Sequence, residues 1–320
     1  IPFVARPYEG LAKEVELVAI NDTATRDMTR YLLKYDSVHG EFKPGVRVID
    51  DENIEVANGE NIKNIRVFST RDLNELNYAD YGADVVLECT GKFLTTEKCE
   101  PYLARGIKKV VMSAPAKDDT PTFVIGVNDD AYAGQAIISN ASCTTNGLAP
   151  VAKVLNDKFG IVKGLMTTIH AYTNGQSLVD VKAKDFRRSR AAALNIGPTT
   201  TGAAKAIAKV LPELNGKLHG QAVRVPVANV SMVDLTAVLK RPASKEEINE
   251  AFRAAAESNL KGILFVDDDY RVSSDFCTST FSSIVASDTT QVIADDMVKV
   301  FAWYDNEWGY STRLVDLAKI

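Results

Sequence analysis

The chain has 320 residues, which is long for one hydrophobic core, so we expect two domains. A net charge of −5 argues against general binding to nucleic acids or membrane surfaces, and the ordinary share of hydrophobic and charged residues is typical of a globular protein. The sequence shows no apolar run of membrane-spanning length, no signal-peptide pattern, and neither CxxC nor zinc-site spacing among its four cysteines. We therefore expect a cytoplasmic protein without a metal.

Short apolar runs alternate with helical patterns through about the first 140 residues. Strands are predicted at 16–20, 84–89, 109–113, 122–127 and 136–138, and helices at 24–35 and 96–105. Strands that alternate with helices imply right-handed crossovers, so this part predicts an α/β fold with a doubly wound parallel sheet.

Asp22 directly follows the first of these strands and precedes a helix. An acidic residue at this position can bind the hydroxyls of an adenosine ribose, although capping of the helix is the plainer interpretation. The glycine-rich loop that should precede such a strand is not found, because the residues before Val15 contain no GxGxxG.

Cys143 lies where the predicted strand 136–138 gives way to a helix that is predicted to end at Gly160. Unpaired N–H groups and the positive end of the helix dipole stabilise a thiolate there, and the thiolate is the reactive form of cysteine. Most buried cysteines are merely small hydrophobic residues, so the position alone leaves both interpretations open.

The hydrophobic pattern changes from residue 164 onward, where the predicted strands are longer and fewer helices separate them. Strands are predicted at 165–172, 222–227, 230–240 and 298–304, and helices at 202–210, 245–260 and 310–320. This pattern predicts an α+β domain with a mostly antiparallel sheet.

His170 lies within the strand predicted at 165–172 and could supply the base that a cysteine nucleophile needs, or be a satisfied core histidine. The segment 173–196 has no clear period and is rich in lysine and arginine. Together with Arg224 and the hydroxyl-rich stretch 199–202 before a helix, it predicts a site for an anion such as phosphate.

The stretch 139–146, SNASCTTN, resembles the active-site signature of phosphorylating glyceraldehyde-3-phosphate dehydrogenases. Further blocks of that family follow in order across nearly the whole chain: AIND at 19–22, YDSVHG at 35–40, CTG at 89–91, SAP at 113–115, GVN at 126–128, TIHAYTN at 168–174, TGAAK at 201–205, RVP at 224–226 and WYDNEWGYS at 303–311. The resemblance implies an NAD-dependent enzyme of glycolysis or gluconeogenesis that converts glyceraldehyde 3-phosphate to 1,3-bisphosphoglycerate.

The same resemblance implies a role for each matching residue. Cys143 would attack the aldehyde to give a thiohemiacetal and then a thioester, and His170 would activate the thiol and stabilise the oxyanion. The substrate phosphate would be held by Thr173, Arg188 and Arg224, and the attacking inorganic phosphate by Ser142, Thr144, Thr201 and Gly202. The cofactor would be held by Asp22, Arg71, Thr90, Gly91, Ser113, Asn174, Asn306 and Tyr310.

The resemblance also implies a domain organisation and an assembly. A Rossmann-type NAD-binding domain would cover 1–142, lacking its first strand and glycine loop, and would be completed by the helix 306–320; a catalytic domain would cover 143–305. A homotetramer is expected, with no membrane and no nucleic acid as primary partner. Asp22 disfavours a 2′-phosphate by charge repulsion, so NAD is expected, and Lys182 leaves some use of NADP open.

The sequence departs from the family at Gly147, where most members carry a second cysteine. A disulfide to that position is excluded, so oxidation of Cys143 would stop at the sulfenic acid until another thiol reacts with it. Two alternatives stay open: an erythrose-4-phosphate dehydrogenase, and a non-catalytic binding protein of the same fold. The phosphate-site residues favour the phosphorylating enzyme over the first, and retention of Cys143, His170 and Arg224 argues against the second.

Overall fold

The computed structural model describes residues 15–59 and 61–320. The expected loss of the first strand and glycine loop concerns residues 1–14, which lie outside the described residues. The described chain divides into two compact units. The first unit comprises residues up to 122 with 132–140 and 314–320, and the second comprises 123–131 and 141–313.

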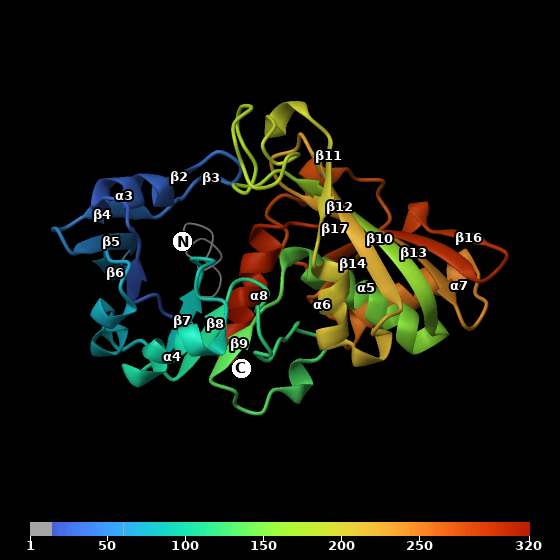
Figure 1. Ribbon diagram of the computed structural model, residues 1–320, viewed down its shortest axis with the longest axis horizontal. Helices are drawn as coiled ribbons and strands as arrows, with labels where there is room; N and C mark the ends of the chain where they lie inside the picture. The colour runs from blue at the N-terminus through green and yellow to red at the C-terminus, as the bar shows by residue number, and fades with distance from the viewer. Residues whose placement is uncertain (1–14, 60) are drawn as a thin grey trace. The chain divides into compact units, whose positions relative to one another are not determined.

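The described part of the first unit contains two main sheets and a short hairpin, drawn in colours from blue to green in Figure 1. One sheet has the order β1-β6-β5-β4, in which β1 and β6 are parallel and the other pairs are antiparallel. The other has the order β7-β8-β9 and is parallel throughout. The elements are β1 (Ala19–Asn21), α3 (Arg26–Lys34), β2 (Tyr35–Asp36), β3 (Gly40–Glu41), β4 (Gly45–Val48), β5 (Asn53–Asn58), β6 (Asn61–Phe68), β7 (Val85–Glu88), α4 (Thr96–Ala104), β8 (Lys109–Met112) and β9 (Ile137–Ser139).

The predicted alternation of strands and helices is confirmed around β7, α4, β8 and β9. Helices α3 and α4 each begin after a threonine, because the side chains of Thr25 and Thr95 accept the exposed N–H of Met28 and Lys98. The antiparallel strands β4, β5 and β6 were not predicted, because much of β6 faces solvent and its polar residues hide the alternation.

The strand predicted at 122–127 is wrong. Apart from a single bridge between Thr122 and Ser139, residues 123–124 are irregular and 125–127 lie in a turn. Phe123 and Val124 are buried as their apolar character demands, but Gly126 has φ +82° and redirects the chain. An apolar run is therefore buried here without being extended.

The second unit is built on a mixed sheet in the order β11-β12-β10-β13-β17-β15-β14, with β16 paired to β17. The β10–β12 and β14–β15 pairs are parallel and the others are antiparallel, which confirms the prediction of a mostly antiparallel sheet. The strands are β10 (Ile161–Ala171), β11 (Gly197–Thr200), β12 (Leu218–Val225), β13 (Ser231–Leu239), β14 (Leu264–Asp267), β15 (Ser283–Ala286), β16 (Gln291–Ile293) and β17 (Met297–Tyr304).

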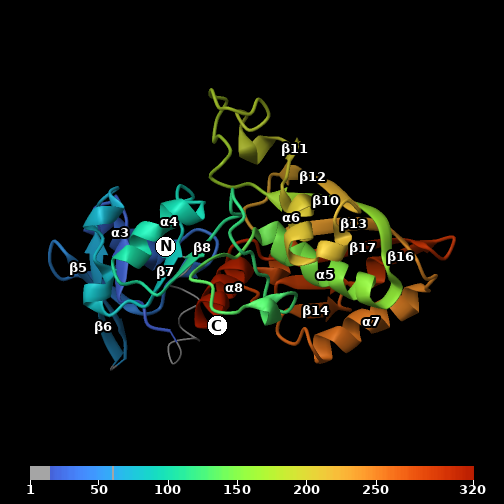
Figure 2. The same ribbon diagram turned by 60° about the horizontal axis from the view of Figure 1, so that its bottom comes forward.

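Helices cover one face of this sheet, as Figure 2 shows. They are α5 (Cys143–Phe159), α6 (Ala203–Val210) and α7 (Lys245–Glu257), followed along the chain by α8 (Trp308–Lys319), whose last residues are grouped with the first unit. Leu148, Ile207 and Phe252 bring the first three helices into one core with Val233 and Leu235 of the sheet. None of the described helices is both long and apolar enough to cross a membrane.

Candidate active site

Cys143 is the first residue of α5, as the sequence predicts. The hydroxyl of Ser142 caps the helix by accepting the Thr145 N–H at 3.0 Å, and the helix ends at Gly160 with φ +71°. Ala141 has φ +55° and is fully buried, and its carbonyl accepts the Tyr310 hydroxyl at 3.1 Å. A non-glycine residue held in the left-handed region shows that the surroundings fix the turn into the helix.

His170 faces the thiol from the carboxyl end of β10. Its Nε2 lies 3.6 Å from Cys143 Sγ, and its Nδ1 lies 2.7 Å from the Ala171 carbonyl oxygen. The Ala171 carbonyl only accepts, whereas Arg224 NH1, which lies 3.1 Å from the same Nδ1, only donates. The carbonyl contact is the shorter of the two, so we assign the proton of the neutral ring to Nδ1 and the lone pair facing the thiol to Nε2. His170 is therefore both a buried, satisfied histidine and a base aimed at Cys143.

The electrostatics of the pair differ from the thiolate that the helix start alone predicts. Burial raises the pKa of Cys143, and the charge of Arg224 and hydrogen bonds from Thr144 only partly oppose it. Burial also lowers the pKa of His170 to about 4, with the charge of Arg224 acting in the same direction. Desolvation thus opposes the helix terminus at Cys143, and burial favours the uncharged form of both groups.

Arg224 lies beside His170 because β12 and β10 pair in parallel with these two residues in register. Its NH1 donates to the Ala171 carbonyl at 3.0 Å and to Thr173 Oγ1 at 3.1 Å. Its Nε is buried with no partner among the described residues. Burial and the nearby charge of Arg188 lower the pKa of Arg224. A bound anion would offset both the lost hydration of the Arg224 guanidinium and its repulsion by Arg188.

The structure brings Thr173, Arg188 and Arg224 together, as predicted for a phosphate site. A Cβ at Gly175 would lie within 4 Å of both Arg188 NH1 and Thr173 Oγ1, so little space separates these groups. Arg188 Nε is held by Thr199 Oγ1 at 3.2 Å, which leaves the rest of the guanidinium free to turn toward an anion.

The residues predicted to hold inorganic phosphate form two separate pairs. Thr144 is buried and its hydroxyl bonds the Tyr304 hydroxyl at 2.9 Å, while Ser142 bonds Thr145. Thr201 and Gly202 lie at the start of α6, where the Thr201 hydroxyl accepts the Ala203 N–H at 3.2 Å and the N-cap residue Gly202 makes no side-chain cap. Within residues 15–59 and 61–320, no hydrogen bond joins the two pairs.

Tyr304, Thr168 and Ser231 were not predicted as site residues. The Tyr304 hydroxyl bonds Thr168 at 2.8 Å as well as Thr144, and its ring stands edge-on to His170 at 6.0 Å. The ring packs on the backbone of Gly147, where a Cβ would approach it to 2.9 Å. Tyr304 belongs to the family block 303–311, and that motif is the sequence signal that could have indicated a role in the site.

The first unit carries five of the predicted cofactor residues. Thr90 and Gly91 follow β7, Ser113 follows β8, and Asp22 follows β1, so all four lie at the carboxyl ends of parallel strands, where nucleotides bind in such sheets. The carboxylate of Asp22 accepts the Ala24 N–H at 2.8 Å through one oxygen. The helix cap is Thr25 rather than Asp22. The fifth residue, Arg71, is exposed.

The second unit carries the other three, Asn174, Asn306 and Tyr310. Asn174 is exposed, whereas Asn306 is nearly buried between β17 and α8. Asn306 Oδ1 accepts the Ser231 hydroxyl at 2.7 Å, and its Nδ2 has no partner among the described residues. A donor left over in this way fits the carboxamide of a nicotinamide, which offers a carbonyl oxygen.

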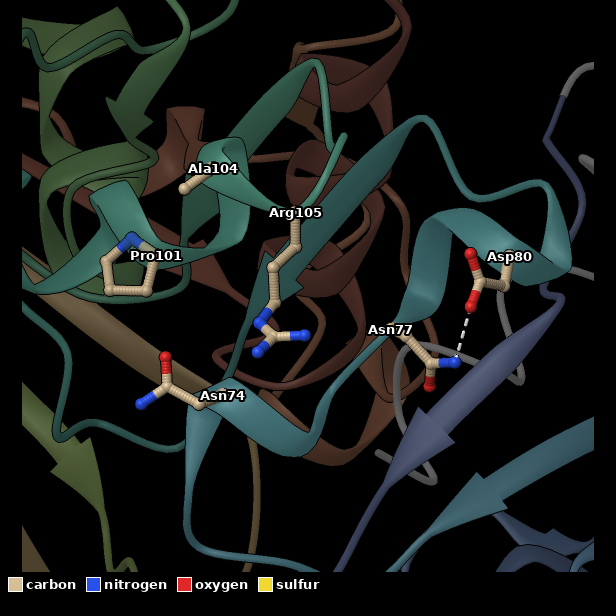
Figure 3. Close-up of a pocket in the computed structure, with 6 residues that line it drawn as sticks. All are labelled: Asn74, Asn77, Asp80, Pro101, Ala104 and Arg105. Carbon is tan, nitrogen blue, oxygen red and sulfur yellow. Dashed lines mark hydrogen bonds between the residues drawn. The ribbon is translucent and has the colours of Figure 1, made fainter.

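Figure 3 shows a cavity of about 480 Å³ in the first unit. Its lining includes Asn74, Asn77 and Arg105, and Asn77 Nδ2 donates to Asp80 at 2.5 Å. None of the predicted site residues lines it.

Comparison with known proteins gives matches to family models for both parts of the chain and to closely similar enzymes. Residues 4–96 match a family model described as the NAD-binding domain of glyceraldehyde 3-phosphate dehydrogenase, and residues 142–306 match its C-terminal domain. The chain is 53% identical over 307 residues to glyceraldehyde-3-phosphate dehydrogenase 1 of Bacillus cereus and to the enzyme of Geobacillus stearothermophilus, covering 95% of this chain and 90% of each relative. It is equally identical to the chloroplastic GAPA1 enzyme of Arabidopsis thaliana, covering 96% of this chain and 76% of that relative.

The chain therefore belongs to the glyceraldehyde-3-phosphate dehydrogenase family. Its cofactor is NAD, as the sequence predicts.

Proposed function

We propose that the chain oxidises glyceraldehyde 3-phosphate to 1,3-bisphosphoglycerate with NAD, through a thioester on Cys143. The observation that carries this proposal is the Cys143–His170 pair, 3.6 Å apart, beside an arginine that lacks a counter-ion at its buried Nε. A thiol with a base supports covalent attack on an aldehyde, and the arginine supports a phosphorylated substrate. The family's domains are assigned here as 1–142 with 306–320 for the cofactor and 143–305 for catalysis.

Catalysis begins from the neutral pair. As Cys143 Sγ attacks the aldehyde carbon, its proton passes to His170 Nε2, while the Ala171 carbonyl keeps the ring in place through Nδ1–H. The protonated ring then donates from Nε2 to the oxyanion of the thiohemiacetal. Bound NAD supplies the hydride acceptor that turns the thiohemiacetal into a thioester. His170 Nε2 takes the hydroxyl proton in that step.

Inorganic phosphate completes the reaction by attacking the thioester carbonyl. The carbon–sulfur bond breaks, the acyl phosphate leaves, and the Cys143 thiolate recovers a proton from His170. Ser142, Thr144, Thr201 and Gly202 are assigned to the attacking phosphate, and the N–H groups in the first turn of α6 beyond Ala203 support that assignment.

We expect omission of inorganic phosphate to slow steady-state NADH formation by at least about tenfold, because the thioester would then leave only by hydrolysis. The measurement is absorbance of NADH with purified protein and glyceraldehyde 3-phosphate, with and without phosphate. Arsenate as an alternative oxyanion nucleophile serves as the control and should restore turnover. Fast turnover without either anion, above all on erythrose 4-phosphate, would contradict the phosphorylating reaction and favour the erythrose-4-phosphate dehydrogenase.

We expect Arg224→Ala to lower kcat/KM for glyceraldehyde 3-phosphate by roughly 10²-fold, because a partly buried charged donor to the substrate phosphate is lost. Activity on unphosphorylated glyceraldehyde should change far less. Arg187→Ala is the matched control, since Arg187 is an exposed arginine of the same basic segment. Equal losses on both aldehydes would show that Arg224 does not recognise the phosphate.

A homotetramer is supported by apolar side chains that the described second unit leaves in solvent. Within the segment 173–196, Leu178, Phe186, Leu194 and Ile196 are each more than two-thirds exposed. Large exposed apolar groups on one segment mark an interaction surface, and a second copy of this chain is the partner we propose. A cytoplasmic location is supported by the cysteines, all four of which are free thiols.

A further inference from the structure

The Ser231 hydroxyl makes two hydrogen bonds within the second unit, one with the Ala171 N–H and one with the Asn306 amide oxygen. The residue is almost fully buried at the start of β13, and its Oγ lies 3.0 Å from the Ala171 nitrogen and 2.7 Å from Asn306 Oδ1. The residue before it, Val230, is buried with φ +66°, a rare conformation for a β-branched residue. The backbone is thus held in an unfavourable turn that aims Ser231 at these two partners.

The chemistry of the three groups settles which way each bond runs. A backbone N–H only donates, so Ser231 Oγ accepts from Ala171 and gives its single proton to Asn306 Oδ1. The oxygen of the Asn306 amide therefore faces Ser231, and Nδ2 faces the opposite way, without a partner among the described residues.

The rotation of this amide is the main freedom left to Asn306. The neighbouring Asp305 is fixed by Asn229 Nδ2 at 3.0 Å and by the Thr278 N–H at 2.8 Å, and it accepts the Trp308 N–H at 2.8 Å. With the backbone anchored in this way, the amide has two orientations of nearly equal shape, one presenting a donor and the other an acceptor. Only the Ser231 hydroxyl distinguishes them.

We propose that Ser231 is a positioning residue that orients the Asn306 amide so that Nδ2 donates to the carbonyl oxygen of the nicotinamide carboxamide. This inference rests on the proposed function, which places the nicotinamide against Asn306. The Ser231 hydroxyl touches neither substrate nor cofactor. It acts through Asn306, and it links Asn306 to Ala171, the residue whose carbonyl holds His170.

Equilibrium binding of two nucleotides tests the proposal without measuring turnover. NAD and ADP-ribose share every group except the nicotinamide, so the ratio of their dissociation constants isolates the nicotinamide contact. Calorimetry would compare wild type, Ser231→Ala, Asn306→Ala and the double variant. We expect Ser231→Ala to reduce the NAD preference about fivefold, as for loss of one hydrogen bond, and to leave ADP-ribose affinity unchanged.

The double variant separates positioning from a general structural role. If Ser231 acts through Asn306, Ser231→Ala has no further effect on the ratio once Asn306 is alanine. Ser283→Ala is the matched control, because Ser283 is a fully buried serine of β15 whose hydroxyl has no partner among the described residues. We expect it to leave the ratio unchanged.

The outcomes distinguish the proposed contact between Asn306 and the nicotinamide from the proposed role of Ser231 in orienting Asn306. An unchanged ratio in Asn306→Ala would overturn the proposed cofactor contact itself. A reduced ratio in Asn306→Ala, combined with no effect of Ser231→Ala or with additive effects in the double variant, would overturn the role of Ser231 alone.

A second measurement needs no change at Ser231, in case its alanine variant fails to fold. The 3-acetylpyridine analogue of NAD keeps the carbonyl oxygen and replaces the amide nitrogen with a methyl group. If Asn306 presents Nδ2, Asn306→Ala weakens binding of NAD and of the analogue by the same factor. A loss confined to NAD would show that the amide presents its oxygen, which would overturn the inference.

Discussion

Cys143→Ser is expected to lower dehydrogenase turnover by roughly 10⁴-fold or more, while the dissociation constant of NAD stays within about twofold of wild type. A serine hydroxyl keeps the shape of the site but ionises far less readily than the thiol, so neither the thiohemiacetal nor the thioester forms at a useful rate. Steady-state NADH formation gives the first quantity and calorimetric titration with NAD gives the second.

Cys277→Ser is the matched control for this prediction. Cys277 is another partly buried thiol of the second unit, and its Sγ accepts a weak contact from Asn229 Nδ2 at 3.8 Å. Its replacement should leave turnover near the wild-type value. Substantial turnover of Cys143→Ser, or an equal loss in Cys277→Ser, would contradict the assignment of Cys143 as the nucleophile.

His170→Asn is expected to lower kcat by about 10²- to 10⁴-fold, because the thiol loses its base and the oxyanion loses a donor. Burial holds the pKa of Cys143 above its ordinary value, so the remaining activity depends on unaided ionisation of the thiol. That activity should therefore keep rising toward alkaline pH. The measurement is a pH–rate profile of both proteins, with His219→Asn, an exposed histidine of β12, as the control. A profile of unchanged shape would count against His170 as the base.

The same variant tests the electrostatic description of the buried ring. Burial lowers the pKa of His170 from its ordinary value of 6.5 to about 4. Between these pH values, His170 is therefore protonated in the unfolded chain and neutral in the folded chain. In the wild type the free energy of unfolding therefore falls as pH falls through that window, by about 3 kcal/mol from this residue. His170→Asn should remove this part of the pH dependence, as measured by urea unfolding at several pH values.

Local sequence signals predicted the local structure of the site well. A strand followed by short polar residues and a helical pattern places Cys143 at the start of α5, and Gly160 ends that helix as predicted. The helix-start argument says nothing of the burial that raises the pKa of the Cys143 thiol, because burial depends on packing between distant segments. The strands β4 to β6 and the turn at 122–127 were missed for a related reason: local apolar pattern does not report which face is covered.

The unpredicted residues act through partners far away in the sequence. Tyr304 reaches Thr144 across 160 positions, and Ser231 reaches Asn306 across 75. No periodicity or spacing rule connects such positions, so only the pairing of β10, β13 and β17 reveals them. Cys143, His170 and Arg224 could be predicted because each belongs to a motif, and Arg188 because it lies in the basic segment 173–196, whereas the hydroxyls that orient them could not.

Ala171 carries a consequence for how the site can change over time. Its N–H donates to Ser231 and its carbonyl holds His170 and Arg224, so all three bonds come from the main chain of this residue. The methyl group of Ala171 takes no part in them, but it is fully buried, so a larger side chain at position 171 would have to displace its neighbours. Evolution can therefore place only a small side chain at position 171, although no side-chain atom of this residue belongs to the hydrogen-bond chain.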